Sequence, residues 1–380
     1  MVLGVPKEEA PGERRVALVP AHVGSLVKAG FEVIVQSGAG TASGYRDERY
    51  REKGVTIVSS REELYSRARV ILRVRAGSEG GYDEGALLSE GQTVIGNFNP
   101  YGAKAEFRPY LEKKAQTYSM ELVPRITRAQ SMDVLSSMAN LAGYYSVILA
   151  AEILPKMFPM MMTAAGTIVP ARVFIVGVGV AGLQAIATAK RLGAMVSAYD
   201  IRPAVKEQVE SLGAKFVEME LETGSAEGEG GYAKAMDEEF YRKQRELMSK
   251  IVAESDVVIT TAAVPGKKAP ILVTREMVSG MQPGSVVVDI AAERGGNCEL
   301  TRAGETVVEE GVTIIGPTNV ASNLAYHASQ LYSKNITSFL LSMTGDGGLA
   351  PDDDDEIVAA TRLTRGGEIA SERASEILTG

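Results

Sequence analysis

Three glycines stand at the spacing G-x-G-x-x-G in the segment GVGVAG, at Gly177, Gly179 and Gly182. A β-branched run ends where the motif begins, and a helical pattern starts inside it, so the motif joins a predicted strand to a predicted helix. In that setting the first glycine allows a tight turn, the second lets a pyrophosphate approach the backbone, and the third lets helix and strand pack closely. N–H groups at the start of the helix then face the phosphates. The motif therefore predicts a dinucleotide site.

An acidic residue follows at the spacing that such a site requires. The next predicted strand ends at Asp200, 18 positions after Gly182, where a carboxylate can accept hydrogen bonds from the adenosine ribose. The same charge repels a ribose 2′-phosphate, so the sequence favours NAD(H) over NADP(H). Arg202 is an ordinary surface residue or a partner for that phosphate, and the sequence leaves both possibilities open.

Composition limits what else the chain can do. It has 380 residues, 45% hydrophobic and 23% charged, which indicates about two globular domains. The net charge of −8 argues against nucleic acid as a partner. One cysteine, Cys298, and two histidines predict neither an internal disulfide nor a metal site. The most apolar stretch, 144–182, is interrupted by charges and prolines, so we expect no membrane-spanning helix and a cytoplasmic location.

The elements around the motif alternate between strand and helix, which is typical of an α/β fold with parallel sheets. In the N-terminal portion we predict strands at 2–5, 32–35, 55–58, 70–74 and 93–97, with helices at 20–29, 61–68 and 103–114. In the portion that contains the motif we predict strands at 171–177, 195–200, 215–219, 256–262, 285–291 and 312–316, with helices at 180–191, 203–211, 235–254 and 274–281. The sequence thus predicts two Rossmann-like lobes.

Two long helical patterns, 131–153 and 320–342, are predicted to join these lobes. We expect a first lobe of residues 1–130 plus 328–380, an NAD(H)-binding lobe of residues 131–327, and a nucleotide cleft between them.

Three segments fall outside the alternation. The Gly-rich, acidic segment 222–236 is predicted to be a lid or a disordered loop. The acidic run 351–356 is predicted to be surface or linker. The methionines at 157 and 160–162 are predicted to form an apolar packing cluster where the lobes connect.

Several long motifs carry a family resemblance. They are RAQSMDVLSSMANLAGYYSVI at 128–148, the glycine segment at 162–194, DVVITTAAVPGKKAP at 256–270, VVDIAAERGGNCE at 287–299 and SQLYSKN at 329–335. In this order they resemble the NAD(H)-binding component of proton-translocating nicotinamide nucleotide transhydrogenases, over most of residues 1–345. VPKEEAPGERRVALVP at 5–20 also resembles alanine dehydrogenases, of the same superfamily.

The resemblance implies specific site residues. Arg125, Gln130, Asp133 and Ser136 match the positions that orient the nicotinamide ring and its carboxamide, for which an amide and a hydroxyl can donate and accept. In the alternative interpretation Asp133 and Ser131 only cap a helix and Gln130 faces water. The expected cofactor-binding set is Gly177, Gly179, Val180, Ala181, Gly182, Asp200, Ile201, Arg202, Thr261, Ala262, Ala263 and Tyr232, the last as a tyrosine that closes over bound nucleotide.

The resemblance also implies partners. In that family hydride passes between NAD(H) on this component and NADP(H) on a partner subunit, and a membrane-domain subunit couples the Re/Si-specific transfer to proton translocation. It implies a homodimeric α subunit without direct membrane insertion, located at the cell membrane through its partners.

Alanine dehydrogenase chemistry fits less well. Where those enzymes carry a lysine and a catalytic histidine, this chain has Arg75 and Asn99, which cannot shuttle protons. The arginine that binds the substrate carboxylate in those enzymes does have a counterpart here, Arg15. An amino-acid dehydrogenase and a non-catalytic NAD-sensing module remain the alternatives.

Overall fold

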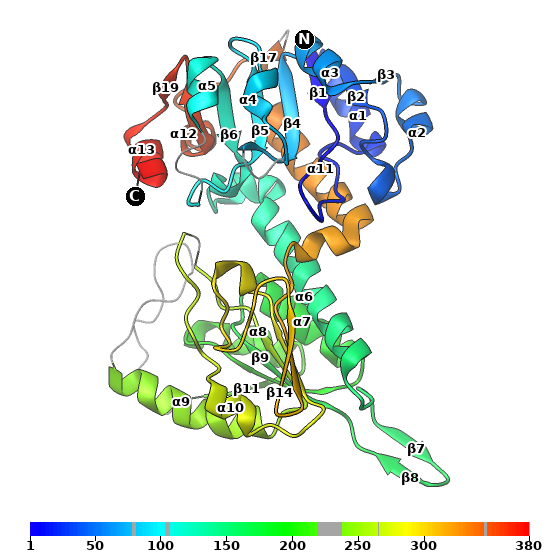
Figure 1. Ribbon diagram of the computed structural model, residues 1–380, viewed down its shortest axis with the longest axis vertical. Helices are drawn as coiled ribbons and strands as arrows, with labels where there is room; N and C mark the ends of the chain where they lie inside the picture. The colour runs from blue at the N-terminus through cyan, green and yellow to red at the C-terminus, as the bar shows by residue number, and fades with distance from the viewer. Residues whose placement is uncertain (78–80, 103–106, 219–237, 265, 346–347, 380) are drawn as a thin grey trace. The chain divides into compact units, whose positions relative to one another are not determined.

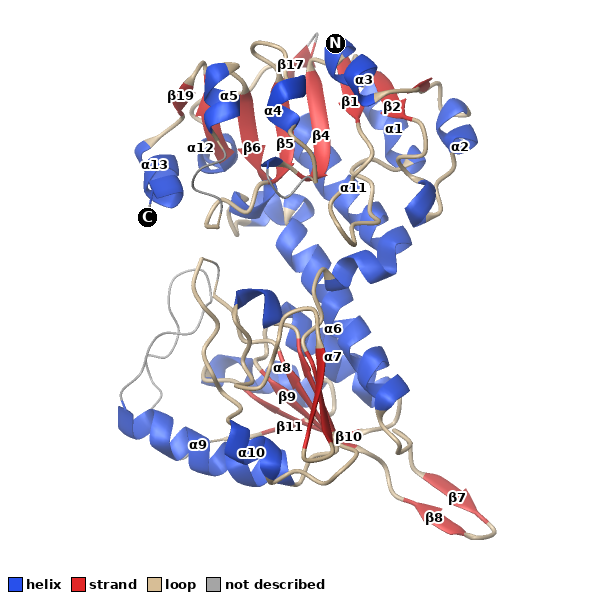
Figure 2. Cartoon of the chain, in the orientation of Figure 1, coloured by secondary structure: helices blue, strands red, loops and turns tan. Residues whose placement is uncertain are grey.

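The structure is a computed structural model that describes residues 1–77, 81–102, 107–218, 238–264, 266–345 and 348–379. The chain divides into two compact units, Met1–Met138 with Ala321–Gly380 (unit 1) and Ala139–Val320 (unit 2), where the sequence predicted divisions at 130/131 and 327/328. Each unit is built on one sheet with helices on its faces (Figure 2). The prediction of an α/β fold with two Rossmann-like, mostly parallel sheets is confirmed.

Unit 1 contains an eight-stranded sheet in the order β19-β18-β6-β5-β4-β1-β2-β3 (Figure 1). Its strands are β1 (Val2–Val5), β2 (Glu32–Gln36), β3 (Thr56–Val58), β4 (Val70–Arg75), β5 (Thr93–Asn97), β6 (Gln116–Ser119), β18 (Arg362–Arg365) and β19 (Glu368–Ile369). Its helices are α1 (Pro20–Lys28), α2 (Asp47–Arg51), α3 (Arg61–Arg67), α4 (Glu84–Leu87), α5 (Arg108–Glu112), α11 (Ala325–Ser342), α12 (Glu356–Thr361) and α13 (Glu372–Thr379). Strands β1 to β6 run parallel, and β18 joins β6 antiparallel.

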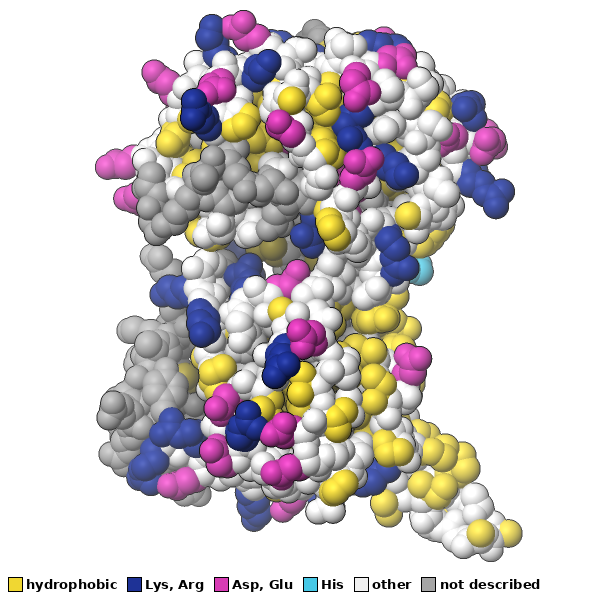
Figure 3. Space-filling view, in the orientation of Figure 1, with side chains coloured by type: hydrophobic (Ala, Val, Ile, Leu, Met, Phe, Trp, Pro, Cys, Tyr) yellow, Lys and Arg dark blue, Asp and Glu magenta, His cyan; other side chains and the backbone are white. Residues whose placement is uncertain are grey.

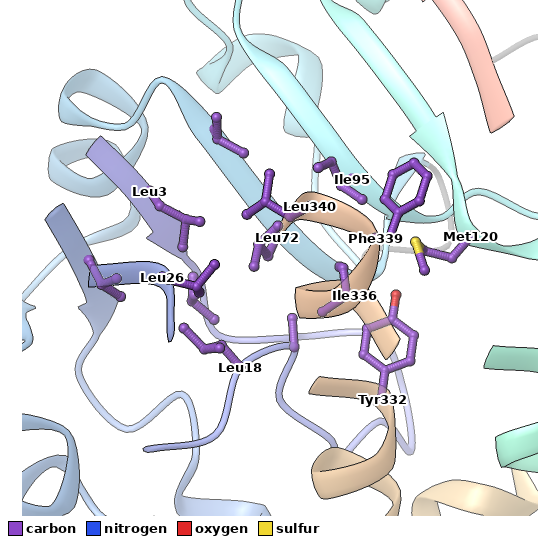
Figure 4. Packing of buried hydrophobic residues seen from close by; sticks show 14 of the residues in the cluster. Leu3, Leu18, Leu26, Leu72, Ile95, Met120, Tyr332, Ile336, Phe339 and Leu340 are labelled. Carbon is purple, nitrogen blue, oxygen red and sulfur yellow. The ribbon is translucent and has the colours of Figure 1, made fainter. Parts of the chain in front are cut away.

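Helix α11 forms one side of the core of unit 1. Its Ile336, Phe339 and Leu340 are fully buried, in one cluster with Leu72 of β4 and Ile95 of β5. Figure 4 shows these side chains gathered between the helix and the sheet. Helix α11, from late in the chain, thus packs on strands from its N-terminal portion.

Unit 2 contains a seven-stranded sheet in the order β11-β10-β9-β12-β13-β15-β14, parallel except for β14. Its strands are β9 (Arg172–Val176), β10 (Met195–Tyr199), β11 (Lys215–Phe216), β12 (Val257–Thr260), β13 (Val286–Asp289), β14 (Thr306–Glu309) and β15 (Val312–Ile315). Its helices are α7 (Val180–Arg191), α8 (Lys206–Ser211), α9 (Glu238–Ala253) and α10 (Arg275–Ser279), and the chain enters it through α6 (Val134–Ile153). The central strands VVIT and VVVD are fully buried, as parallel strands covered on both faces require.

The structure corrects several local predictions. The helix predicted at 103–114 is described only as α5, Arg108–Glu112, and the long helix predicted from 131 begins at Val134 after a 3₁₀ helix, η4 (Thr127–Met132). The long helix predicted at 320–342 likewise opens with a 3₁₀ turn, Val320–Leu324. Strands β6, β14 and β18 were not predicted, because their sequences alternate polar and apolar residues too weakly.

The methionine prediction is wrong. Met161–Thr163 and Gly166–Ile168 form a hairpin, β7 and β8, and Met160 and Met162 are 59% and 77% exposed. Short apolar runs do not reveal whether they pack inside their own domain or project from it.

The acidic run lies at the surface, as predicted, since Asp352–Asp354 and Glu356 are exposed, but two of its carboxylates also form ion pairs. Asp353 forms ion pairs with Arg362 and Arg365, and Asp355 pairs with Arg128. The sequence pattern gave no sign of these pairs because their partners lie 9 to 227 positions away.

Candidate nucleotide-binding site

The glycine motif forms the turn between β9 and α7. Gly177 has φ +92°, in the left-handed region that favours glycine. A Cβ on Gly182 would lie 2.0 Å from the carbonyl oxygen of Gly177, so only glycine allows this closeness of helix and strand. A Cβ on Gly179 would meet no described atom within 4 Å. Two of the three glycines are therefore required by the fold itself, and the third is not.

The turn lies at the point where the strand order reverses. Strand β9 has β10 on one side and β12 on the other, so the next loop to meet the turn follows β12. Thr261 in that loop donates its backbone N–H to the carbonyl of Val176 (2.8 Å) and its hydroxyl to the carbonyl of Gly177 (2.9 Å). The structure thus brings the glycine turn and Thr261–Ala262 together, at the position where open α/β sheets bind ligands.

Helix α6 supports this turn from outside. A Cβ on Gly143 of α6 would lie 2.1 Å from the carbonyl oxygen of Ala181, so α6 packs on the first turn of α7 at backbone distance. Ala181 is half-buried, whereas Gly182 is buried.

Asp200 follows directly after β10 and is largely enclosed by its own neighbours. One carboxylate oxygen accepts from the backbone N–H of Val178 (2.7 Å), and the other from that of Arg202 (2.9 Å). The Arg202 guanidinium donates to both oxygens, from Nε and Nη2, at 2.8 Å each. The two residues left open by the sequence therefore form one ion pair, whose side chains are 6% and 15% exposed. Ile201 between them is half-buried.

A buried Asp and Asn that the sequence analysis did not single out hold the loop after β12. Asp289, at the end of β13, accepts hydrogen bonds from the backbone N–H groups of Asn297 (2.7 Å) and Cys298 (2.9 Å). Asn297 in turn donates its side-chain amide to the carbonyl of Ala262 at 2.8 Å. The segment GGNCE carried the family resemblance, but no pattern within it indicated this bracing role.

Burial raises the pKa of the Cys298 thiol to about 11. The cysteine is 1% exposed and so lies in the protein interior.

The residues expected near a nicotinamide lie in unit 1, around the start of α6. Asp133 accepts from the backbone N–H (2.9 Å) and the hydroxyl (2.6 Å) of Ser136, so it caps the helix. Gln130 and Arg125 are exposed. Capping does not prevent this hydroxyl from binding a ligand, because the Ser136 oxygen still has lone pairs to accept a hydrogen bond. Tyr232, with the whole of segment 222–236, lies outside the described residues.

The counterparts of the dehydrogenase residues in unit 1 are all held by buried or half-buried glutamates, the two arginines through ion pairs and Asn99 through its backbone N–H. Arg15 donates to both oxygens of Glu13 at 2.7 Å, and Arg75 donates to Glu13 at 3.0 Å. Asn99 has φ +47°, and its N–H is held by Glu121 at 2.8 Å. Burial raises the pKa of the Glu121 carboxyl.

Within the described residues no group of three or more His, Cys, Asp or Glu is placed to hold a metal ion. Helix α6 is the only described helix that is long and apolar enough to span a membrane, and an apolar helix packed on a domain core passes the same test. The expectation of no membrane-spanning helix stays a prediction.

Two family models match this chain along most of its length. The N-terminal domain of the alanine dehydrogenase/PNT family matches residues 4–142, and the C-terminal domain of that family matches residues 146–372. The chain belongs to the alanine dehydrogenase/PNT family.

Within this family the similarity is graded. The chain is 49% identical over 374 residues to a protein of Rhodospirillum rubrum named as the first portion of NAD(P) transhydrogenase subunit alpha, covering 97% of each chain. It is 28% identical over 361 residues to an alanine dehydrogenase of Methanococcus maripaludis, covering 91% of this chain and 88% of that one.

Solved structures follow the same grading. A transhydrogenase from Sinorhizobium meliloti matches with a TM-score of 0.87 and 47% identity, covering 97% of this chain and all of the other. An L-alanine dehydrogenase matches with a TM-score of 0.82 and 25% identity, covering 99% of each. The predicted resemblance is confirmed, and the transhydrogenase branch is the more similar one.

Proposed function

We propose that this chain is the NAD(H)-binding α subunit of a Re/Si-specific, proton-translocating transhydrogenase, and that it exchanges hydride with NADP(H) held by a partner subunit. The graded similarity supports this function over alanine oxidation. So does the residue set in unit 1, where Arg75 and Asn99 offer no group that takes up or releases a proton near neutral pH.

The observation that carries the proposal is the contrast among the three motif glycines. Gly177 and Gly182 are explained by backbone conformation and packing, whereas neither backbone conformation nor packing within the described chain requires glycine at position 179. A dinucleotide pyrophosphate approaches the backbone at the second glycine of this motif, and a side chain there would occupy its place. The residues present therefore fit a dinucleotide.

The chain's own groups then have distinct tasks. The first N–H groups of α7 lack intrahelical acceptors, as at any helix start, and bind the phosphates from Val180 onward. Asp200 binds the ribose hydroxyls and disfavours a 2′-phosphate, which selects NAD(H). Thr261, Ala262 and Ala263 form the wall beside the glycine turn.

The chemistry that bound NAD(H) supplies is hydride donation or acceptance at the nicotinamide ring. Arg125, Gln130, Asp133 and Ser136 orient that ring and its carboxamide, with Tyr232 closing over the nucleotide. Because hydride transfer between two nicotinamides needs no proton shuttle, the protein's contribution is positioning.

The proposed assembly includes a second copy of this chain, an NADP(H)-binding subunit and a membrane-domain subunit. The apolar hairpin supports the homodimer. Met162 and Val169 are each 77% exposed, and Figure 3 shows hydrophobic side chains gathered over the hairpin, which is uncommon on a monomer. Sedimentation of the purified chain as a monomer would contradict the dimer.

The deciding variant is Gly179→Ala. Alanine fits the backbone at this position (φ −83°, ψ −165°) and meets no described atom, so the free energy of unfolding should fall by no more than the poorer N-cap costs, about 1 kcal/mol. NADH binding, followed by nucleotide fluorescence, should weaken by about tenfold or more, since one Cβ displaces the pyrophosphate. Gly24→Ala is the matched control, because Gly24 lies in α1 with equally open surroundings, and NADH binding should not change.

Activity separates the alternatives. Hydride exchange between NADH and an NADP⁺ analogue should occur when the chain is mixed with membranes that contain its partner subunits, and be nearly absent with the chain alone. L-alanine-dependent NAD⁺ reduction by the isolated chain would instead identify a dehydrogenase. NADH binding without exchange in the mixture would identify a sensor module. A pH-sensitive dye inside membrane vesicles tests the coupling to proton movement.

A further inference from the structure

The acidic run near the C-terminus reaches the loop that leads into α6. The Asp355 carboxylate and the Arg128 guanidinium form a two-pronged ion pair, with Nη1 to Oδ2 at 2.6 Å and Nη2 to Oδ1 at 3.0 Å. Their positions in the sequence are 227 residues apart. Both belong to unit 1, so the pair is internal to one compact body.

Asp355 is fixed in place by the fold of the C-terminal segment. It is the N-cap of α12, where its Oδ1 accepts from the backbone N–H of Ile357 at 2.7 Å. Ile357 and Val358 are buried in the main core of unit 1. The next strand, β18, pairs with β6 and so continues the sheet. The carboxylate is therefore anchored to the sheet of unit 1.

Arg128 lies on η4, whose backbone is held from other directions too. Ala129 and Met132 are buried in the core cluster that contains α11. The carbonyl of Ser131 accepts from the side-chain amide of Asn335, on α11, at 2.9 Å. The exposed Gln130 lies between these fixed points, so its direction depends on how firmly η4 is held.

We propose that Arg128 and Asp355 are positioning residues whose ion pair fixes η4, and with it Gln130, for contact with the nicotinamide. This inference rests on the proposed function. It assigns a role to a C-terminal segment whose charges the sequence pattern described as solvated.

Arg128 is 53% exposed, and exposed pairs contribute little to the free energy of unfolding. A two-pronged guanidinium–carboxylate contact nevertheless restricts orientation as well as distance. Transfer reactions depend steeply on placement, so loss of the pair should reduce the rate of hydride transfer more than it reduces stability.

The variants are Arg128→Ala and Asp355→Asn. Asparagine caps a helix as well as aspartate does, so Asp355→Asn removes the charge and keeps α12. Arg365→Ala is the control, because it removes an ion pair with Asp353 in the same C-terminal segment, and its arginine is about as exposed (51%) as Arg128 (53%).

The first measurement is backbone hydrogen exchange over residues 127–133 of the full chain without nucleotide. Exchange should accelerate about two- to fivefold in both pair variants, which is what the loss of one exposed pair allows, and not in Arg365→Ala. The second measurement is hydride transfer in the mixture with partner subunits. Here kcat should fall about tenfold while KM for NADH changes less than twofold, and the double variant should be no slower than either single variant.

The outcomes are distinguishable. Unchanged exchange or unchanged kcat in the pair variants overturns the inference, as does an equal loss of kcat in Arg365→Ala. If the wild-type mixture transfers no hydride, the proposed function fails, and the inference fails with it. Accelerated exchange in the pair variants would then show that the error lies in the function and not in the contact.

Discussion

The central strands of the two sheets follow one order, in which the chain switches from one side of the first strand to the other. Different residues lie at this switch point in the two units. In unit 1 the order is β3-β2-β1-β4-β5-β6, and in unit 2 β11-β10-β9-β12-β13 repeats it. The reversal falls between β1 and β4 in one unit and between β9 and β12 in the other. In both units this is the position where doubly wound sheets bind ligands.

In unit 1 the chain's own charges meet at this point. Arg73 of β4 is fully buried and pairs with Glu8 (3.1 Å), which follows β1, and with Glu84 (2.7 Å). In unit 2 the corresponding turn is made of glycines, with the Asp200–Arg202 pair bound to Val178 and open space beside Gly179. The topology therefore offers the place, and the residue types in the turn decide whether side chains or a ligand use it.

The largest expected effect is on the buried charges. Arg73→Leu leaves two buried carboxylates without their cation, so it should lower the free energy of unfolding by about 3–5 kcal/mol, measured by urea titration of the full chain. Arg67→Leu is the control, because its pair with Glu63 is exposed and should contribute less than about 1 kcal/mol. Equal losses of unfolding free energy in the two variants would contradict the larger contribution expected from the buried pairs.

A second test uses the titration of the Glu13 carboxyl, also in unit 1. Burial works to raise the Glu13 pKa, but the hydrogen bonds and charge of Arg15 outweigh it and lower the value to about 2, from 4.5. Because the folded pKa is the lower one, the stabilisation is complete above about pH 4.5 and is lost as the pH falls towards 2. The shift corresponds to roughly 3 kcal/mol.

Unfolding free energies measured between pH 5 and pH 2.5 check this. Glu13→Gln should flatten the decline over that range, and an unchanged slope would contradict the assignment.

The sequence predicted the glycine turn of unit 2 better than the buried charges of unit 1 for a physical reason. A glycine turn, the strand before it and the helix after it are local, so Gly177, Gly182 and the start of α7 at Val180 could all be placed from spacing. The cluster around Arg73 joins residues up to 65 positions apart, and no local pattern encodes such a contact.

The same limit applies within the candidate site. Asp200 was found by its distance from the glycines, but its enclosure by Arg202 depends on a side-chain conformation. Asn297 was missed because it acts on Ala262 from a separate loop. Helix starts were placed well where a cap or a proline marks them, as Pro20 does for α1, and less well at the 3₁₀ turns.

The smallest expected effect concerns Arg202. Asp200 accepts four hydrogen bonds, two from the Arg202 guanidinium and one each from the backbone N–H groups of Val178 and Arg202. A carboxylate accepts about four in all, so ribose hydroxyls must displace the Arg202 side chain. Arg202→Ala removes that competition and should tighten NADH binding by about fivefold, the equivalent of roughly 1 kcal/mol. NADPH binding should stay weak, because Asp200 still repels a 2′-phosphate. Parallel titrations with both nucleotides measure this, and weaker NADH binding would show that Arg202 contacts the cofactor and does not compete with it.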